Sequence, residues 1–372
     1  MEPDKRLTHS RMATAKSCLR KHQYRYELGI RGIKEAKALR MGTAFHRGRE
    51  YGWTMTPDEA IVKAITKSYD GVSRGDTTPG EDYAWQLERE IVARLLSGYF
   101  WRWADTDASE FEVVSTEKNF EVPLRNPATG KSTPSFTLAG KRDAILISRT
   151  DGRRILYEMK STSDPVEPDG DFWLVLVIEA QLSTYYIAAD AEGQPCETAL
   201  YDVIRKPSIR PRLIPLLDDD KCKIVRDEVG QRIYNKPTKA QEKAGEKGKP
   251  RQSANIENGW VLETRPETID EYGTRLTADI GDQPERYYAR REVPRLQADL
   301  DEHAFELWQY QQLLRECQRE SRWPKTTSQC LAFGRCEFFN LCTGGFDVAE
   351  FESTRMLPDG FMLADTVHPE LA

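Results

Sequence analysis

The chain has 372 residues, of which 39% are hydrophobic and 31% charged, and its formal net charge is −6. This length and apolar content are enough for one large domain or two moderate ones. No apolar run approaches the roughly 18 to 20 residues of a membrane span, and the first residues lack the apolar segment of a signal peptide, so we expect a soluble, cytoplasmic protein.

The charge is unevenly distributed along the chain. Residues 1–50 carry a net charge of +8 and residues 205–255 carry +7, so the remainder carries −21. Local basic surfaces can attract phosphates whatever the total charge, because salt screens electrostatic fields over about 8 to 10 Å. Ordinary solvated surface charge explains the same pattern, so charge alone does not decide between the two interpretations.

The N-terminal third is predicted to be mostly helical. Residues 8–30 suit one helix with mixed faces, and residues 41–53 and 58–70 also look helical. Between residues 84 and 104, apolar side chains recur every three or four positions, which indicates an amphipathic helix.

Short apolar runs separated by turn signals then predict strands. The runs lie at residues 111–114, 120–122, 136–138, 144–147 and 155–157. Residues 172–189 return to a helical pattern, and residues 200–204 predict one more strand.

The last part of the chain begins with residues 235–255, which have no apolar stripe and predict a mobile basic loop. A strand at 287–293 and a helix at 299–322 follow, the helix ending at Trp323–Pro324. We expect five regions: a helical N-terminal region, a core, a basic insertion, a C-terminal helix with a cysteine segment, and a tail. Their bounds are 1–110, 111–215, 216–298, 299–345 and 346–372.

Three functional groups stand out on two of the predicted strands. Glu158 and Lys160 are two residues apart and therefore point to the same face of a strand. Asp143 lies on the preceding strand, at a distance from the Asp151–Gly152 turn that puts it roughly opposite them. Two carboxylates and a lysine can hold a divalent cation and meet a phosphate. The alternative is a solvated hairpin, but the apolar flanks indicate buried strands, where unpaired charge is costly.

Two further pairs have the spacing of one helical turn. Gln181 and Tyr185 share a helix face and could contact the substrate backbone or orient the lysine. Upstream, His46 and Glu50 have the same spacing, although a lone histidine is more often a structural hydrogen bonder than a ligand.

The order of Gly-x-x-x-His46, Gly140-x-x-Asp143, Glu158-x-Lys160 and Gln181-x-x-x-Tyr185 resembles the RecB-like branch of the PD-(D/E)XK nuclease superfamily. The resemblance implies an α/β restriction-endonuclease-like core, a mixed sheet flanked by helices. It also implies that His46, Asp143 and Glu158 ligate Mg²⁺ or Mn²⁺, that Lys160 positions the attacking water, and that Gln181 and Tyr185 form the helix motif beside the site.

Four of the seven cysteines form a second constellation. Cys330, Cys336 and Cys342 are evenly spaced, and Cys18 is the obvious fourth ligand. Spacing alone leaves zinc, an iron–sulfur cluster and simple burial open, although two-residue spacings are commoner for zinc, which favours iron–sulfur. The resemblance extends to iron–sulfur RecB-like nucleases, such as the AddB type and the CRISPR-adaptation exonucleases, and implies a structural [4Fe–4S] cluster that joins the chain ends.

The resulting hypothesis is a metal-dependent DNA exonuclease that acts on single-stranded ends or overhangs in recombination, repair or CRISPR adaptation. Tyr24 and Arg25, together with Arg205 and Lys206, could follow a single strand by stacking and phosphate contacts, or could simply cover the surface. Two rival hypotheses are a non-catalytic protein that binds DNA ends and an iron–sulfur sensor with a vestigial nuclease core.

Overall fold

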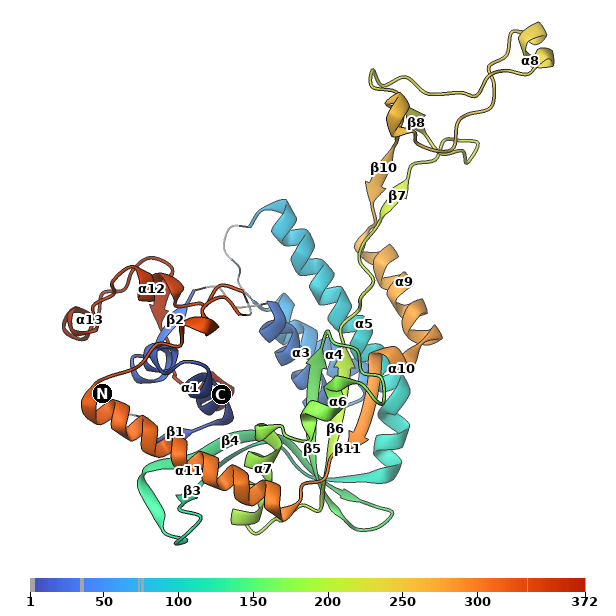
Figure 1. Cartoon of the computed structure of the whole chain (residues 1–372). Helices are drawn as coiled ribbons and strands as arrows, with labels where there is room; N and C mark the ends of the chain where they lie inside the picture. The colour runs from blue at the N-terminus through green and yellow to red at the C-terminus, as the bar shows by residue number, and fades with distance from the viewer. Residues whose placement is uncertain (1–3, 34–36, 73, 75–76, 333, 372) are drawn as a thin grey trace.

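The computed structural model describes residues 4–33, 37–72, 74, 77–332 and 334–371. Its centre is a six-stranded mixed sheet flanked by helices, with strands in the order β1-β4-β5-β6-β11 and β3 paired to β4 (Figure 1). The strands are β1 (Arg6–Leu7), β3 (Phe111–Arg125), β4 (Ser132–Ser148), β5 (Arg154–Thr162), β6 (Thr198–Arg205) and β11 (Tyr288–Glu292).

One face of the sheet packs against helices from two parts of the chain. Their buried side chains form one core cluster with Leu146, Tyr157 and Ile204 of the sheet. Thr78 and Glu81 form a reciprocal capping box that fixes the start of the longest of these helices. The elements on this side are α3 (Lys37–Gly52), α4 (Pro57–Ile65), η2 (Thr66–Asp70), α5 (Pro79–Glu110), α9 (Ile269–Asp282) and the short α10 (Pro284–Tyr287).

The other face is covered by α7 (Ala180–Ala191) and α11 (Gln297–Glu320), with α1 (His9–Ser17) beside them. Their apolar side chains form a second core cluster with Leu156, Tyr201 and Val203. Because neighbouring residues of a strand point to opposite faces, the two clusters take alternate residues of the same strands. The sheet is thus buried on both sides.

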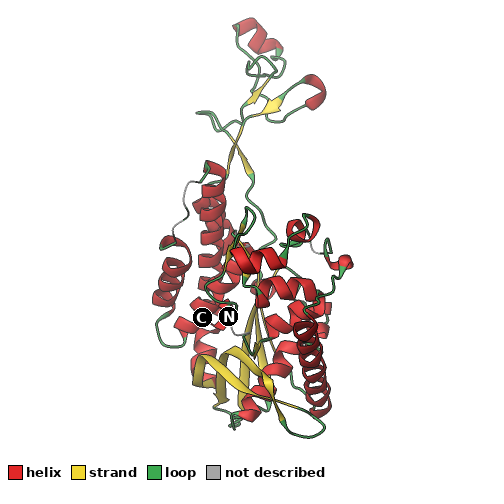
Figure 2. Cartoon of the chain, turned by 90° about the vertical axis from the view of Figure 1, so that its left-hand side faces the viewer, coloured by secondary structure: helices red, strands yellow, loops and turns green. Residues whose placement is uncertain are grey.

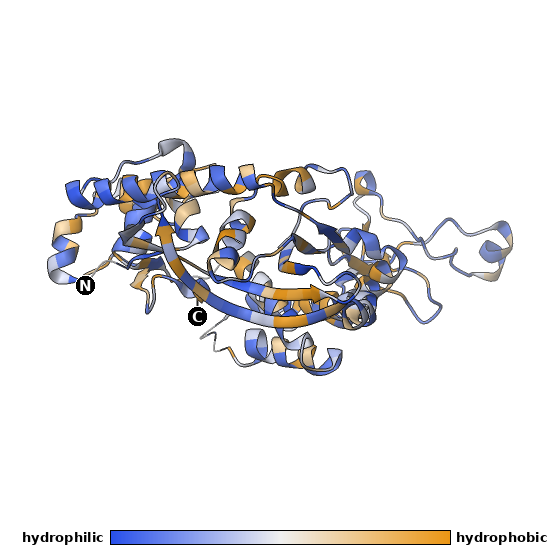
Figure 3. Cartoon of the chain, turned by 90° about the horizontal axis from the view of Figure 1, so that it is seen from below, coloured by the Kyte–Doolittle hydropathy of each residue, from blue (hydrophilic) through white to orange (hydrophobic). Residues whose placement is uncertain are grey.

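Strands β3 and β4 are longer than the sequence predicts. Each joins two of the predicted apolar runs into one continuous strand, and Figure 3 shows hydrophilic and hydrophobic residues alternating along the long curved strands. At Gly140 an added Cβ would lie 2.5 Å from the Phe120 ring and 3.3 Å from Tyr185. This glycine therefore allows β3, β4 and α7 to approach closely.

The predicted helix 172–189 is two helices, α6 (Asp171–Leu176) and α7, because Arg295 donates hydrogen bonds to the carbonyl oxygens of Leu176 and Glu179 between them. By length and composition alone, Asp171–Ala191 is apolar enough to cross a membrane, contrary to our expectation from the sequence. Half of this segment is buried, and α7 contributes Leu182 to the second core cluster.

The two ends of the chain lie side by side. Thr8 Oγ1 donates a 2.7 Å hydrogen bond to Glu370, and His368 Nε2 lies 3.3 Å from Asp4. The elements of this region are α2 (Leu19–His22), η1 (Gln23–Glu27), β2 (Ile30–Gly32), η4 (Thr327–Gln329), α12 (Phe339–Thr343), α13 (Val348–Thr354), β12 (Phe361–Leu363) and η5 (Pro369–Leu371). Strand β12 pairs with β2 and so joins the two termini.

The prediction of a single helix over residues 8–30 is wrong, because the helix is interrupted at Cys18. This residue is extended, with φ −163° and ψ 118°, and its Sγ accepts a 3.4 Å hydrogen bond from the backbone N–H of Thr326. The N–H of Arg20 donates to the Pro324 carbonyl oxygen. Contacts with the C-terminal segment thus replace the helical hydrogen bonds.

An arm formed by residues 213–266 projects from the body (Figures 1 and 2). It contains β7 (Leu213–Pro215), β8 (Val225–Arg226), α8 (Lys239–Ala244), η3 (Ile256–Asn258), β9 (Val261–Leu262) and β10 (Thr264–Pro266). Helix α8 lies inside the segment predicted as a loop. Thr238 and Gln241 form its capping box, and Gly245 in the left-handed conformation ends it, so local end signals outweigh the missing apolar stripe.

Candidate active site on strands β4 and β5

Asp143 and Glu158 come from adjacent antiparallel strands. Ala144 of β4 pairs with Tyr157 of β5, so the next position along each strand brings Asp143 opposite Glu158. Glu158 is 1% exposed, and the Asp143 side chain is 14% exposed. The hairpin therefore holds two acidic groups at the border of the core, where an uncompensated charge would be costly.

Asp143 has two partners that favour its charged form. Its Oδ1 lies 3.2 Å from Nδ1 of His46 on α3, and its Oδ2 accepts a 2.7 Å hydrogen bond from the backbone N–H of Met159. Burial opposes ionisation, but His46 and the Met159 N–H outweigh it and lower the pKa of Asp143. Burial would likewise lower the pKa of His46, yet the Asp143 and Glu158 carboxylates raise it to about 9. The two residues form an ion pair.

Glu158 and Lys160 form the second ion pair of the site, with Nζ of Lys160 2.7 Å from Oε1 of Glu158. Burial raises the pKa of Glu158 to about 7 despite the nearby ammonium group. Burial lowers the pKa of Lys160, but the carboxylates outweigh this and the net change is upward. Oε2 of Glu158 is buried and has no hydrogen-bond partner among the described residues, so this carboxylate retains capacity for a ligand.

Helix α7 holds the lysine through a short chain of hydrogen bonds. Lys160 Nζ donates to Gln181 Oε1 at 2.5 Å, and Gln181 Nε2 donates to the Tyr185 hydroxyl at 2.7 Å. Tyr185 packs edge-on against the Phe120 ring. The ammonium group is thus fixed by a side chain that is itself anchored in the core.

Sequence reasoning missed Glu117. Its neighbours Thr116 and Lys118 pair with Ala144 and Arg142, so Glu117 stands opposite Asp143. Its φ of 45° is in the left-handed region, which is uncommon for a residue other than glycine and often marks a functional position. Counting residue pairs back from the Asn126–Lys131 turn would have placed Glu117 opposite Gly140, because the register of the two strands shifts between Pro123 and Arg125. No local signal in the sequence marks this shift.

His46, Glu117 and Asp143 could hold a cation together, because their potential ligand atoms all lie within 4.8 Å of one another. This set shares His46 and Asp143 with the one expected from the resemblance but has Glu117 in place of Glu158. Oxygen donors with one imidazole suit Mg²⁺ or Mn²⁺. Glu158, the residue opposite Asp143, is outside this group of ligands, although its Oε2 has no partner among the described residues.

The four cysteines of the second constellation come together at the joined chain ends. Cys18, Cys330 and Cys336 line a cavity of about 270 Å³, and Cys342 is close enough for Cys18 and Cys336 to raise the pKa of its thiol, after burial as the main cause. All seven cysteines are free. In a tetrahedral zinc site the sulfurs would lie about 3.8 Å apart. Among the described residues, no group of three or more cysteines has its sulfurs within 4.8 Å of one another.

The residues expected to contact DNA are in different environments. Tyr24 is 2% exposed and packs against Phe338, so the expectation that it stacks on bases is wrong. Nη1 of Arg25 is engaged 3.0 Å from Glu337. The N–H of Lys206 bonds the Thr162 carbonyl oxygen, which places Lys206 just beyond the end of β6. Arg205 lines a separate groove.

Comparison with protein families gives a match over most of the chain. The model of the PD-(D/E)XK nuclease superfamily matches residues 6–343. A comparison with curated proteins gives no significant match. One matching solved structure is named "Crystal structure of SSO0001". It has 16% sequence identity and a TM-score of 0.20, and the match covers 41% of this chain and 74% of that one. This likeness is too weak to support an argument about function.

Proposed function

Since this chain belongs to the PD-(D/E)XK nuclease superfamily, we propose that it is a metal-dependent deoxyribonuclease that hydrolyses phosphodiester bonds at the β4–β5 site. The observation that carries the proposal is the convergence of Asp143, Glu158 and Lys160. The unpartnered, buried oxygen of Glu158 needs a cation or a donor to offset its burial.

His46, Glu117 and Asp143 are placed to hold a divalent cation. The family resemblance adds Glu158 as a ligand. When bound, Mg²⁺ or Mn²⁺ would supply Lewis-acid stabilisation of the negative charge that develops on the phosphoryl group. The positive charge of the cation would also keep Glu158 ionised, although burial, partly offset by Lys160, raises the pKa of Glu158 to about 7.

The role of Lys160 follows from its surroundings. Its ammonium group lies at the mouth of the site with its side chain 32% exposed, held by Glu158 and Gln181. A positive charge fixed in this way can donate a hydrogen bond to a phosphate oxygen or to the attacking water without reorganising. Tyr185 acts through Gln181 and is therefore a positioning residue.

The proposed substrate is the end or overhang of single-stranded DNA, cleaved exonucleolytically during end processing in recombination, repair or CRISPR adaptation. Support comes from the family and from an arginine-lined groove beside the site. The intact set of Asp143, Glu158 and Lys160 favours an enzyme over a non-catalytic binder. The cytoplasmic location stays a prediction from the sequence.

A structural [4Fe–4S] cluster held by Cys18, Cys330, Cys336 and Cys342 is the second part of the proposal. It is supported by the cavity that Cys18, Cys330 and Cys336 line and by the nearness of Cys342 to two of them. Cluster ligands from both ends of the chain would supply folding energy and hold the termini together.

End-labelled single-stranded and double-stranded DNA incubated with the protein and Mn²⁺ or Mg²⁺ tests the proposal. We expect a ladder or mononucleotides from single-stranded DNA, no product in EDTA, and no product from Asp143→Ala. A mobility shift without cleavage in either metal would contradict the enzyme and favour the DNA-end binder. Absence of both cleavage and binding would favour the iron–sulfur sensor.

A further inference from the structure

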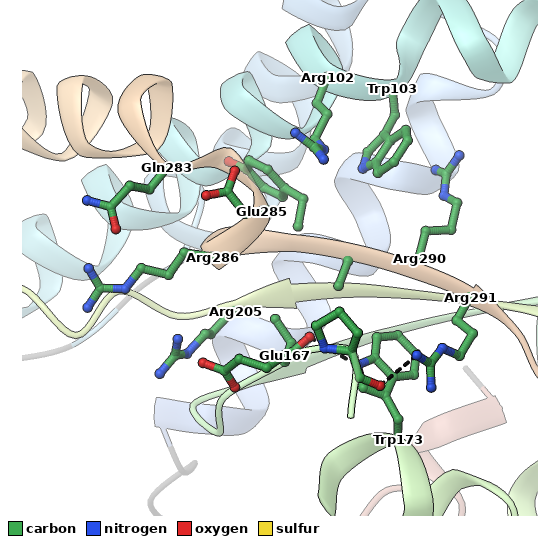
Figure 4. Close-up of a pocket in the computed structure, with 14 residues that line it drawn as sticks. Arg102, Trp103, Glu167, Trp173, Arg205, Gln283, Glu285, Arg286, Arg290 and Arg291 are labelled. Carbon is green, nitrogen blue, oxygen red and sulfur yellow. Dashed lines mark hydrogen bonds between the residues drawn. The ribbon is translucent and has the colours of Figure 1, made fainter. Parts of the chain in front are cut away.

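A groove with a volume of about 720 Å³ lies along β11, the edge strand of the sheet (Figure 4). Arg102 and Trp103 reach it from α5, on one side of β11, whereas Trp173 and Glu167 lie on the other side. Five arginines and two glutamates line it, so the lining carries a net charge of +3. A lining with this charge attracts anions.

Three of the arginines have structural partners. Arg286 donates a hydrogen bond to Ser208 and lies 3.9 Å from Asp279. Arg290 lies 2.6 Å from both Asp107 and Asp202 and is therefore neutralised within the fold. Arg291 donates a 2.6 Å hydrogen bond to the Pro168 carbonyl oxygen and lies over the Trp173 ring. These contacts shape one wall of the groove.

Other donors in the lining have no acceptor in the part of the chain that the structure describes. Arg205 has no hydrogen bond or ion pair through its guanidinium group there. Nε of Arg102 and Nε1 of Trp103 are buried and also have no hydrogen-bond partner. The carboxylates of Glu167 and Glu285 form no ion pair with these arginines within that part of the chain. The hydrogen-bonding capacity of these donors is therefore available to an acceptor that enters the groove.

The groove is separate from the candidate active site, but Arg205 in its lining lies near Lys160 in the sheet. Strands β5 and β6 are parallel, with Lys160 opposite Val203 and Thr162 opposite Arg205. Arg205 therefore points to the same face of the sheet as Lys160. The Cα atoms of Lys160 and Arg205 lie one strand spacing apart across the sheet and two residues apart along it, which corresponds to about 8 Å. This separation corresponds to roughly one to two nucleotides of a single strand.

We propose that this groove binds the backbone phosphates of single-stranded DNA that extends beyond the β4–β5 site, with Arg102 and Arg205 as the main phosphate contacts. The planar guanidinium fork matches the oxygens of a phosphate, and the Trp103 N–H adds a neutral donor. This proposal rests on the proposed nuclease function, because it assumes that the DNA bound in the groove also reaches Lys160 at the β4–β5 site.

Fluorescence anisotropy of a labelled 12-nucleotide single-stranded DNA, measured in EDTA, tests the groove without any cleavage. The test protein is Arg102→Gln/Arg205→Gln, which removes two charges without breaking an ion pair among the described residues. The matched control is Arg315→Gln/Arg319→Gln, which removes two exposed charges from α11. Circular dichroism checks that both variants fold.

We expect the groove variant to bind at least about tenfold more weakly than the control, and its salt dependence to fall by about 1.4 in log–log slope, about 0.7 for each phosphate lost. The gain in affinity from 4 to 12 nucleotides should also disappear. Equal affinity and slope in both variants would overturn the proposal, as would a mononucleotide or inorganic phosphate that binds as tightly as the oligonucleotide.

The two proposals fail in different ways. If wild-type protein cleaves DNA and the groove variant binds like the control, the groove assignment fails and the nuclease function stands. If wild-type protein does not cleave in any metal while the groove variant alone loses affinity, the nuclease function fails and the groove assignment stands.

Discussion

The carboxylate–lysine site and the cysteine constellation are built in opposite ways. Asp143 and Lys160 are 17 positions apart on one hairpin, and backbone pairing fixes their side chains. Cys18 and Cys342 are 324 positions apart and meet only because the chain ends pack together. The first site inherits its geometry from the sheet, and the second depends on contacts that are distant in sequence.

This difference predicts different responses to mutation. Removing a group from the hairpin site should change chemistry and leave the fold intact, because the strands are held by backbone hydrogen bonds and two core clusters. Removing a cysteine should loosen the joined ends, because closing a loop of about 300 residues is entropically costly.

The largest expected effect is on catalysis. Lys160→Ala should lower the cleavage rate by about 10³-fold, because it removes the positive charge that faces the phosphoryl group. Its melting temperature should stay within a few degrees of the wild type. A rate within tenfold of the wild type, or loss of the folded state, would contradict the view that the hairpin site supports chemistry and not the fold. Lys131→Ala, in the exposed β3–β4 turn, is the control.

The next largest effect concerns the chain ends. Cys18→Ser should abolish visible iron–sulfur absorbance in anaerobically purified protein and lower its melting temperature by about 5 to 10 °C, the equivalent of about 3 kcal/mol. Cys222→Ser in the arm should change neither property. Iron-free wild-type protein with an unchanged melting temperature in the Cys18 variant would contradict the cluster.

Glu117→Gln should sharpen the description of the hairpin site. Loss of one carboxylate ligand should raise the Mn²⁺ concentration for half-maximal cleavage by about tenfold and preserve the rate at saturating metal. Glu112→Gln, at an exposed position of the same strand, should behave as the wild type. An unchanged metal requirement in the Glu117 variant would exclude this residue as a ligand.

A pH effect on stability is expected where helices α11 and α7 meet. His303 of α11 bonds Thr184 of α7 at 2.8 Å, and burial lowers the pKa of His303 to about 4. His303 binds a proton near pH 6.5 in the unfolded chain but only near pH 4 in the folded chain. Its contribution to the free energy of unfolding is therefore complete above pH 6.5 and is lost as the pH falls towards 4. From pH 7.5 to 5.5 this histidine should account for about 1.3 kcal/mol of lost stability.

Urea unfolding of wild-type protein and His303→Gln at both pH values measures this contribution. The variant should lose about 1.3 kcal/mol less than the wild type between the two pH values. Equal losses in the two proteins would mean that His303 is protonated in the folded state or does not link the helices.

The smallest effect is expected for the arm, which belongs to neither site. No residue of the arm contributes to the three core clusters, and its paired ends β7 and β10 lie side by side. Replacing residues 216–263 by a short glycine–serine turn should leave the melting temperature within about 2 °C and the cleavage of a 12-nucleotide DNA unchanged. A larger loss would show that the arm supports the body.

Local patterns predicted much of the fold. The short apolar runs at 144–147 and 155–157, bounded by turn signals, predicted two central strands. The spacing of Ile91, Leu95 and Tyr99 predicted α5, because these side chains face the core along one side of the helix. The predictions failed where residues distant in sequence determine the local structure. At Cys18, hydrogen bonds with the C-terminal segment replace helical hydrogen bonds, and the same segment buries Tyr24.

The sequence by itself determined that Asp143, Glu158 and Lys160 share one hairpin, because a strand has a two-residue period and a turn sets the register. Only the tertiary structure decided that Glu117 joins His46 and Asp143, that Gln181 holds Lys160, and that Arg102 and Arg205 line one groove. These neighbours come from separate helices and strands, and their meeting depends on how the elements pack, which no local pattern encodes.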